Sequence, residues 1–123
     1  MSAYLYVALG GSVGACLRYF LTQQSTKLFS DNFPYGILLV NVIGSFFLGL
    51  LYAWLEQHPN ISDNIRLIFG VGLLGALTTF STFSLDTITL FMQGEVLRAI
   101  ANTLSNVVLC LLGVYLAFMI VKG

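Results

Sequence analysis

Charged side chains are scarce in this sequence of 123 residues. Five basic and five acidic residues make up 8% of the chain, whereas a soluble domain usually carries about 25%. Because 58% of the residues are hydrophobic, the polar ones are too few to coat a globule. The composition therefore predicts an integral membrane protein embedded in a lipid bilayer. The balanced charge argues against nucleic acid as a partner.

Signals of catalysis, disulfide pairing and secretion are also missing. The two cysteines, Cys16 and Cys110, both fall inside apolar stretches, so we expect packed free thiols. The sequence has no Cys/His cluster, Walker loop or nucleophile elbow, and His58 stands alone in a polar connector. The protein is therefore expected not to be an enzyme. The first residues lack Lys, Arg and a separate cleavage region, so we expect no cleaved signal peptide.

Four apolar stretches are each long enough to cross the membrane once. They cover about 4–21, 36–55, 65–92 and 96–121, and a crossing helix needs roughly 20 residues. The polar connectors between them leave no room for a soluble domain. The sequence thus predicts an all-α membrane protein with four transmembrane helices and a single transmembrane domain, 1–123.

The basic residues give little preference for one orientation. Four crossings place Arg66 and Lys122 near one side of the membrane, and Arg18, Lys27 and Arg98 near the other. Two against three is a weak positive-inside bias. Either the chain inserts both ways up and pairs as an antiparallel dimer, or the N-terminal charge or a lipid effect decides its orientation.

Small residues recur at a spacing that lets helices approach closely. Gly10 and Gly14 form a GxxxG pair, and Ser45 and Gly49 form a similar pair of small residues. Helix packing is the role that we expect for most of these glycines. Four short helices also enclose little space, which favours an oligomer.

The stretch "GALTTFSTFS", residues 75–84, carries five hydroxyl side chains at apparent membrane depth. The β-branched threonines and Gly75 lower helix preference, and the hydroxyls compete for backbone groups. We expect the third helix to be broken here, with freed carbonyls that could coordinate a small cation. Phe80 and Phe83 would share one face and could meet an anion with their positive ring edges. The alternative is a polar kink with both rings in the core.

Further polar residues lie within the other apolar stretches. Arg18 lies about 21 Å along the first helix, either reaching the headgroups or attracting anions at the mouth of a cavity. Asn41 in the second helix could join helices or donate to an anion. Asn102, Asn106 and Cys110 recur at every fourth position of the last helix, which favours the wall of a wet path over packing alone.

These residues fall within three motifs that are typical of one family. "GGSVGACLRY", "LVNVIGSFFLG" and "GLLGALTTFSTFSLD" occur in that order. The chain resembles the Fluc or CrcB family of small microbial fluoride channels along nearly its whole length. The resemblance implies an antiparallel, dual-topology homodimer with two pores in the cell (inner) membrane. Such a dimer would pass fluoride out of the cytoplasm in preference to chloride and so lower fluoride toxicity.

The resemblance also implies roles for individual residues. Phe80 and Phe83 match the rings whose edges line the fluoride path, and Asn41 matches an amide that donates to fluoride. The carbonyls of Gly75 and Thr78 match positions that hold a structural sodium ion at the dimer axis. The remaining matches are Ser81 and Thr82 as hydroxyls of the break, Arg18 as the vestibule arginine, and Asn102, Asn106 and Cys110 as the polar track.

Two other functions compete with this interpretation. A small dual-topology multidrug or cation exporter needs an acidic residue in mid-span, but the acidic residues lie in or near connectors and Asp86 lies late in its span. An accessory subunit that only packs against a larger complex would explain the glycines. It would explain neither the polar helix face nor the broken helix.

Overall fold

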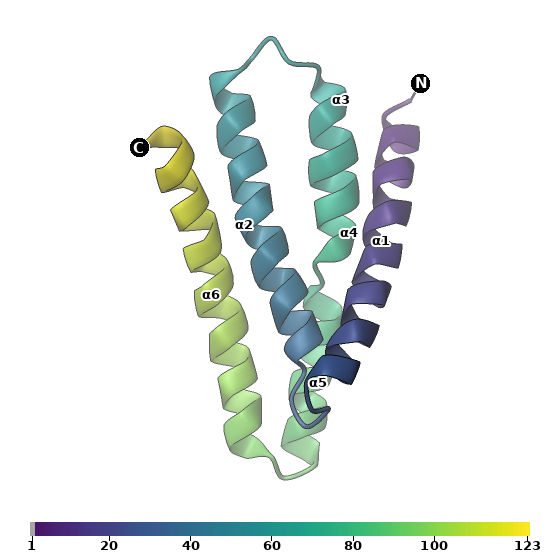
Figure 1. Cartoon of the computed structure of the whole chain (residues 1–123), viewed down its shortest axis with the longest axis vertical. Coiled ribbons are helices and arrows are strands. Elements are labelled where there is room, and N and C mark those ends of the chain that lie inside the picture. The colour runs from purple at the N-terminus through teal and green to yellow at the C-terminus, as the bar shows by residue number, and fades with distance from the viewer. Residues whose placement is uncertain (1) are drawn as a thin grey trace.

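The computed structural model describes residues 2–123, and in that part of the chain four helical segments are long and apolar enough to cross a membrane. They are Ala3–Leu28 (α1), Tyr35–Gln57 (α2), Asp63–Met92, and Val96–Lys122 (α6). No strand occurs within residues 2–123. The predicted all-α fold with four transmembrane helices is therefore confirmed (Figure 1).

The first helix extends beyond the predicted apolar span of about 4–21. α1 continues to Leu28. The polar residues after the apolar stretch continue the helix, and the Thr22 and Thr26 hydroxyls donate to carbonyls of the preceding turn, at 3.0 and 3.1 Å. As a result, Arg18 lies well inside α1 instead of near its far end.

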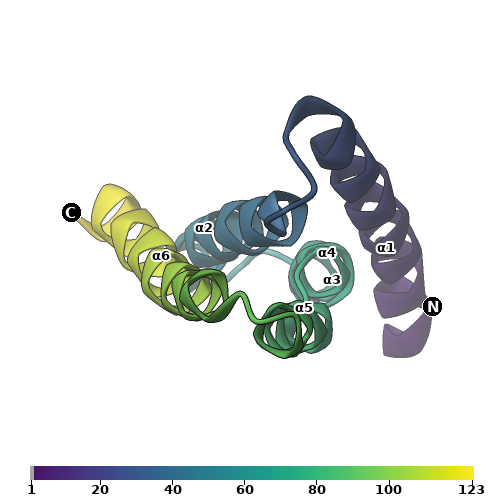
Figure 2. The same cartoon turned by 90° about the horizontal axis from the view of Figure 1, so that it is seen from below.

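The third span is not one continuous helix. It consists of α3 (Asp63–Ile65), a π-helical segment η1 (Arg66–Leu74), a single turn α4 (Gly75–Leu77), and α5 (Phe80–Met92). Thr78 and Thr79 are extended and separate α4 from α5. In Figure 2 the axis of α5 is displaced sideways from that of α3 and α4. The predicted break is confirmed, whereas the π-helical segment was not predicted.

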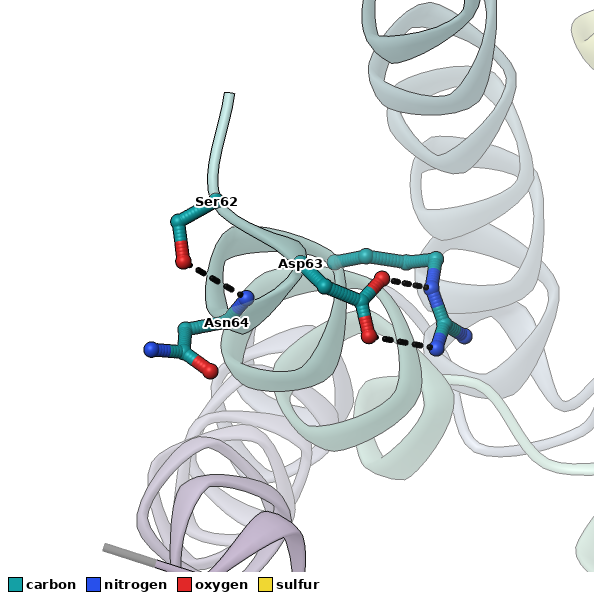
Figure 3. Close-up of polar contacts among 4 residues, drawn as sticks. Ser62, Asp63 and Asn64 are labelled. Carbon is teal, nitrogen blue, oxygen red and sulfur yellow. Dashed lines mark hydrogen bonds and ion pairs between the residues drawn. The ribbon is translucent and has the colours of Figure 1, made fainter. Parts of the chain in front are cut away.

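The third span begins with a capped and charged turn at the membrane edge. Ser62 accepts a hydrogen bond from the backbone N–H of Asn64 at 3.2 Å. The Asp63 carboxylate accepts two hydrogen bonds from the Arg66 guanidinium, at 2.9 and 3.2 Å (Figure 3). An acidic residue at a helix N-terminus complements the helix dipole, and the exposed ion pair adds little stability of its own.

Glycines set the two main helix contacts. α1 packs on η1 and α2 packs on α6. A Cβ atom added to Gly10 or Gly14 would collide with backbone carbonyls of η1, and one added to Gly49 would lie 2.9 Å from the Cβ of Ala117 in α6. These glycines therefore permit close helix packing, as their spacing predicted.

The connectors lie at two opposite ends of the molecule. Both termini and the connector 58–62 lie at one end, and the connectors 29–34 and 93–95 lie at the other, as expected for four crossings (Figure 1). Gly94 has a φ angle of 82° in the short turn between α5 and α6, a conformation that glycine adopts without strain. The break in the third span lies between these two ends.

Candidate functional site

The break at Thr78 and Thr79 is a defined structure with its own hydrogen bonds. Thr78 has φ −86° and ψ 157°, and Thr79 has φ −154° and ψ 123°, so both residues are extended. The Thr79 hydroxyl then accepts from the backbone N–H of Thr82 at 3.1 Å and caps the start of α5. The Thr78 hydroxyl donates back to the carbonyl of Leu74 at 3.0 Å, which closes α4. The hydroxyl residues of the sequence motif therefore end one helix and begin the next.

Asn41, on the neighbouring helix α2, forms hydrogen bonds to the backbone of the break. Its Oδ1 accepts from the backbone N–H of Thr79 at 2.7 Å, and its Nδ2 donates to the backbone carbonyl of Thr79 at 3.1 Å. The side-chain amide of Asn41 thus bonds to both backbone groups of the extended residue Thr79, as the backbone of a neighbouring β-strand would. Both residues are less than 10% exposed, so the loss of these bonds would leave buried backbone groups unpaired.

A cavity of about 430 Å³ opens beside the break. The rings of Phe80 and Phe83 lie on it with their centroids 5.4 Å apart and their planes at 59°. Phe83 is 8% exposed, whereas Phe80 is 77% exposed on the single chain. The other lining residues are Asn41, Ser45, Gly75, Thr78, Thr79, Asn106, Val107, Cys110 and Leu111.

The predicted polar face of α6 takes part in a buried row of amides. Asn102 and Asn106 are 1% and 5% exposed, and Nδ2 of Asn106 donates to Oδ1 of Asn102 at 3.0 Å. The row continues at both ends. Nδ2 of Asn41 donates to Oδ1 of Asn106 at 3.0 Å, and Nδ2 of Asn102 donates to the Thr87 hydroxyl at 2.9 Å. The row therefore joins α2, the break, α6 and α5.

The structure brings together only some of the residues predicted for the path. Asn41, Phe80, Phe83, Asn106 and Cys110 all line the cavity, and Cys110 is a free thiol. The others lie outside it. Asn102 is buried behind Asn106, and Ser81 and Thr82 gather around the Thr79 hydroxyl, each with its oxygen 3.2 Å from Thr79 Oγ1. The predicted roles of these three residues in the path stay predictions.

Arg18 contacts the break directly. Its Nη1 donates to the carbonyl of Thr78 at 3.4 Å, so the guanidinium lies beside the break. Its role, as a headgroup anchor or as a vestibule cation that attracts anions, stays a prediction.

The carbonyls of Gly75 and Thr78 have the chemistry that a sodium site requires. In a continuous helix they would accept from the N–H groups of Thr79 and Thr82, but those N–H groups bond to Asn41 Oδ1 and to Thr79 Oγ1. The break therefore frees both carbonyls from backbone N–H partners, and the Gly75 carbonyl keeps only a long contact from the Thr78 hydroxyl, at 3.5 Å. The Arg18 bond to Thr78 is long, and a carbonyl oxygen has a second lone pair. The residues present thus fit a sodium ion in chemistry.

Three residues of the site had been missed or assigned a different role by the sequence analysis. Ser45 was assigned to helix packing, yet it lines the cavity. Thr79 supplies both backbone groups to Asn41, and Thr87 ends the amide row. Ser45 follows Asn41 by one helical turn, and this spacing could have indicated a shared face.

Acidic side chains do not reach this cavity. Asp86 lines a separate polar cavity of about 430 Å³ at the end of the molecule that holds the connectors 29–34 and 93–95. Asp31, Glu95 and Arg98 lie in the same cavity, and Arg98 pairs with Glu95 at 3.4 Å. The cavity beside the break therefore presents amide, hydroxyl and aromatic groups without a carboxylate.

Comparisons with known proteins agree with the motifs. The family described as "CrcB-like protein, Camphor Resistance (CrcB)" matches residues 5–118. A protein of Shewanella denitrificans named "Fluoride-specific ion channel FluC" is 53% identical over 116 residues, which cover 94% of this chain and 93% of the relative. A protein of the same name from Alteromonas mediterranea is 48% identical over 123 residues, which cover 100% of this chain and 97% of the relative. The resemblance is thus confirmed, and the chain belongs to the CrcB-like family.

Proposed function

We propose that this chain forms a fluoride-selective ion channel in the cell (inner) membrane. It passively exports fluoride from the cytoplasm and so lowers fluoride toxicity. Two relatives that match nearly all of the chain carry the name of such a channel. The observation that carries the proposal is the cavity beside the broken helix, which two phenyl rings and a buried amide line together without a carboxylate.

The chemistry of the cavity suits a small, strongly hydrated anion. An isolated ion in an apolar environment would cost tens of kcal/mol, so a pore must replace the lost water with donors along the path. Asn41 carries two N–H groups, which donate to Thr79 and Asn106 in this structure. Ser45 provides a hydroxyl, and Phe80 and Phe83 provide positively polarised ring edges. Asn106 and Cys110 complete the wall on α6. These weak donors bind the ion without trapping it.

We further propose that two copies associate as an antiparallel homodimer with two pores. The cavity is open on one side, and Phe80 is 77% exposed on the single chain. Lipid tails offer no hydrogen-bond donors, so they could not close an anion path. A second copy, packed in the opposite sense, would cover the exposed ring and complete each pore. It would also bring the carbonyls of two breaks together.

Dual topology is supported by the position of the basic residues. Arg66 and Lys122 lie toward the end that holds both termini, and Lys27 and Arg98 lie toward the other end. Arg18 lies at the depth of the break and favours neither end. A chain without a charge bias inserts in both orientations. In a variant whose two native cysteines, Cys16 and Cys110, are replaced by serine, roughly half of the copies that carry Asn60→Cys should therefore react with a thiol reagent outside the cell. Labelling of all copies or of none would contradict dual topology.

The carbonyls of Gly75 and Thr78 are proposed to hold a structural sodium ion at the dimer axis. Each copy would contribute two freed oxygens, and oxygen is the donor that hard cations prefer. When bound, the ion would supply a positive charge near the two paths. Asn41 and the Thr79 hydroxyl would keep Thr78 and Thr79 extended, so that these carbonyls stay available to the ion.

Reconstitution into liposomes tests the proposed function. Vesicles loaded with fluoride are diluted into fluoride-free buffer, and the efflux is followed with a fluoride electrode after an ionophore has balanced the charge. We expect rapid fluoride efflux, with hardly any chloride efflux from vesicles loaded with chloride. Vesicles that retain fluoride, or that release both halides equally, would contradict the proposal.

A further inference from the structure

The Asn41 amide has no free donor in this structure. One N–H of Nδ2 donates to the carbonyl of Thr79 at 3.1 Å, and the other donates to Oδ1 of Asn106 at 3.0 Å. An amide nitrogen carries two hydrogens, so both are used. Any anion that enters the cavity and binds Asn41 must therefore displace or share one of these two acceptors.

Of the two acceptors, Asn106 is the one that an anion can replace. Asn41 and Thr79 are joined at two points, and Thr79 is a backbone partner whose release would undo the break. The bond from Asn41 to Asn106 is a single contact between two side chains. Asn106 lines the cavity, so its Oδ1 lies where an anion that enters the cavity could reach the same N–H.

The orientation of Asn106 is fixed by the whole row of hydrogen bonds. Its Nδ2 donates to the backbone carbonyl of Asn102 at 2.9 Å and to Oδ1 of Asn102 at 3.0 Å. Asn102 donates to the Thr87 hydroxyl, which donates to the carbonyl of Phe83 at 2.8 Å. At the other end, the backbone N–H of Thr79 donates to Asn41.

The bonds that link successive members of this row all point the same way, from the break toward α5, and only the bond from Asn41 Nδ2 to the Thr79 carbonyl points back to the break. The row begins at a backbone N–H and ends at a backbone carbonyl, and neither group can change its donor or acceptor character. No single amide can be reversed without losing bonds at both of its ends. Asn106 therefore presents an oxygen and not an N–H to Asn41.

We propose that Asn106 is a built-in competitor for fluoride: its side-chain oxygen occupies the acceptor position at Asn41 Nδ2 that the ion must take. This inference rests on the proposed channel function. Without an ion, the oxygen keeps the buried donor satisfied. When fluoride arrives, the ion gains one N–H bond while the protein gives up the bond between Asn41 and Asn106. The competition weakens binding to a level that permits rapid release, as conduction requires.

The test compares Asn106→Ala with a matched control on the same helix, Leu109→Ala. The control removes the same number of heavy atoms from a side chain that is 42% exposed and lies outside the cavity. Fluoride currents are measured in planar bilayers over a range of fluoride concentrations. In Asn106→Ala the half-saturating fluoride concentration should fall about three- to tenfold, as expected for the loss of one competing hydrogen bond. The maximal current should fall as well, and Leu109→Ala should match the wild type.

The bilayer measurements distinguish a failure of this inference from a failure of the proposed channel function. If Asn106 only helped to hold the ion or to support the fold, its removal would raise the half-saturating concentration or leave it unchanged, and either result would overturn the inference. A wild type that passes no fluoride would instead contradict the proposed function.

A second variant and a second measurement guard against a misfolded Asn106→Ala. Asn102→Ala removes one of the two bonds that orient Asn106 and should shift the half-saturating concentration in the same direction by a smaller factor. In wild-type protein in detergent, titration with sodium fluoride should shift the nuclear magnetic resonance signals of the side-chain amides of both Asn41 and Asn106. Fluoride-dependent shifts of Asn41 alone would contradict the displacement.

Discussion

Asn41→Asp perturbs the centre of the site with little change in shape. The amide makes three hydrogen bonds, two as a donor and one as an acceptor, at 2.7 to 3.1 Å. An aspartate at this position can still accept from the N–H of Thr79. A neutral acid has one donor where the amide has two, and an ionised one has none. At least one of the two acceptor oxygens, on Thr79 and Asn106, therefore loses its partner.

The cost follows from burial. Asn41, Thr79 and Asn106 are 7%, 9% and 5% exposed, so water does not readily replace the lost bonds. One buried acceptor without a partner costs about 1–3 kcal/mol, and two cost about 2–6 kcal/mol. Because about 1.4 kcal/mol corresponds to a tenfold change in an equilibrium constant, even the smaller loss lowers the equilibrium constant for forming the break by about five- to 150-fold. We expect fluoride flux to fall at least about fivefold relative to the wild type.

The assay is fluoride efflux from liposomes at equal protein density. Size-exclusion chromatography in detergent checks that the variant keeps the oligomeric state of the wild type. Asn60→Asp is the matched control, because it makes the same chemical change in the connector 58–62, outside the site. The control should conduct as the wild type does. An Asn41→Asp variant that passes fluoride at the full rate would refute the assigned role of Asn41 in the break and in the path.

Three further changes test other parts of the account. Phe80→Ile removes a ring edge from the cavity and should lower fluoride efflux at least about tenfold. Phe91→Ile, on an exposed part of α5, is the control and should leave the efflux unchanged. Equal effluxes from the two variants would contradict the role of the Phe80 ring. Gly14→Ala places a methyl group against a backbone carbonyl of η1 and should destabilise the protein by about 1–3 kcal/mol, seen as a lower Tm in detergent. Gly11→Ala is its control because the nearest atom to the added Cβ lies 3.9 Å away, and an equal Tm for both variants would contradict the packing. Replacement of sodium by a large organic cation should stop fluoride efflux reversibly, and unchanged efflux would exclude the proposed sodium site.

The sequence predicted the broken helix because the local chemistry decides it. The Thr79 hydroxyl accepts from the backbone N–H of Thr82 and so caps a new helix, which a continuous helix does not permit, and such local competition is visible in the sequence. The spans were also predictable because apolar length is a local property. The end of α1 was missed because Thr22 and Thr26 satisfy their hydroxyls within the helix, so a polar segment did not mark its end.

The partners of the amides could not be predicted, since they depend on tertiary contacts. The spacing of Asn102 and Asn106 indicated a shared face, but not that this face would be buried against Asn41 and Thr87. The π-helical segment η1 packs closely on α1 at Gly10 and Gly14, and this contact joins residues far apart in the chain. The glycine spacing predicted close packing without naming the partner helix.

The central claim is that fluoride passes selectively and passively through the cavity beside the break. The reversal potential of purified protein in a planar bilayer tests it most directly, with a tenfold fluoride gradient across the membrane and equal chloride on both sides. A fluoride-selective channel should reverse at the fluoride equilibrium potential, about 59 mV for a tenfold gradient of a monovalent ion. A reversal potential near zero would show that chloride or another ion carries the current and would contradict the account.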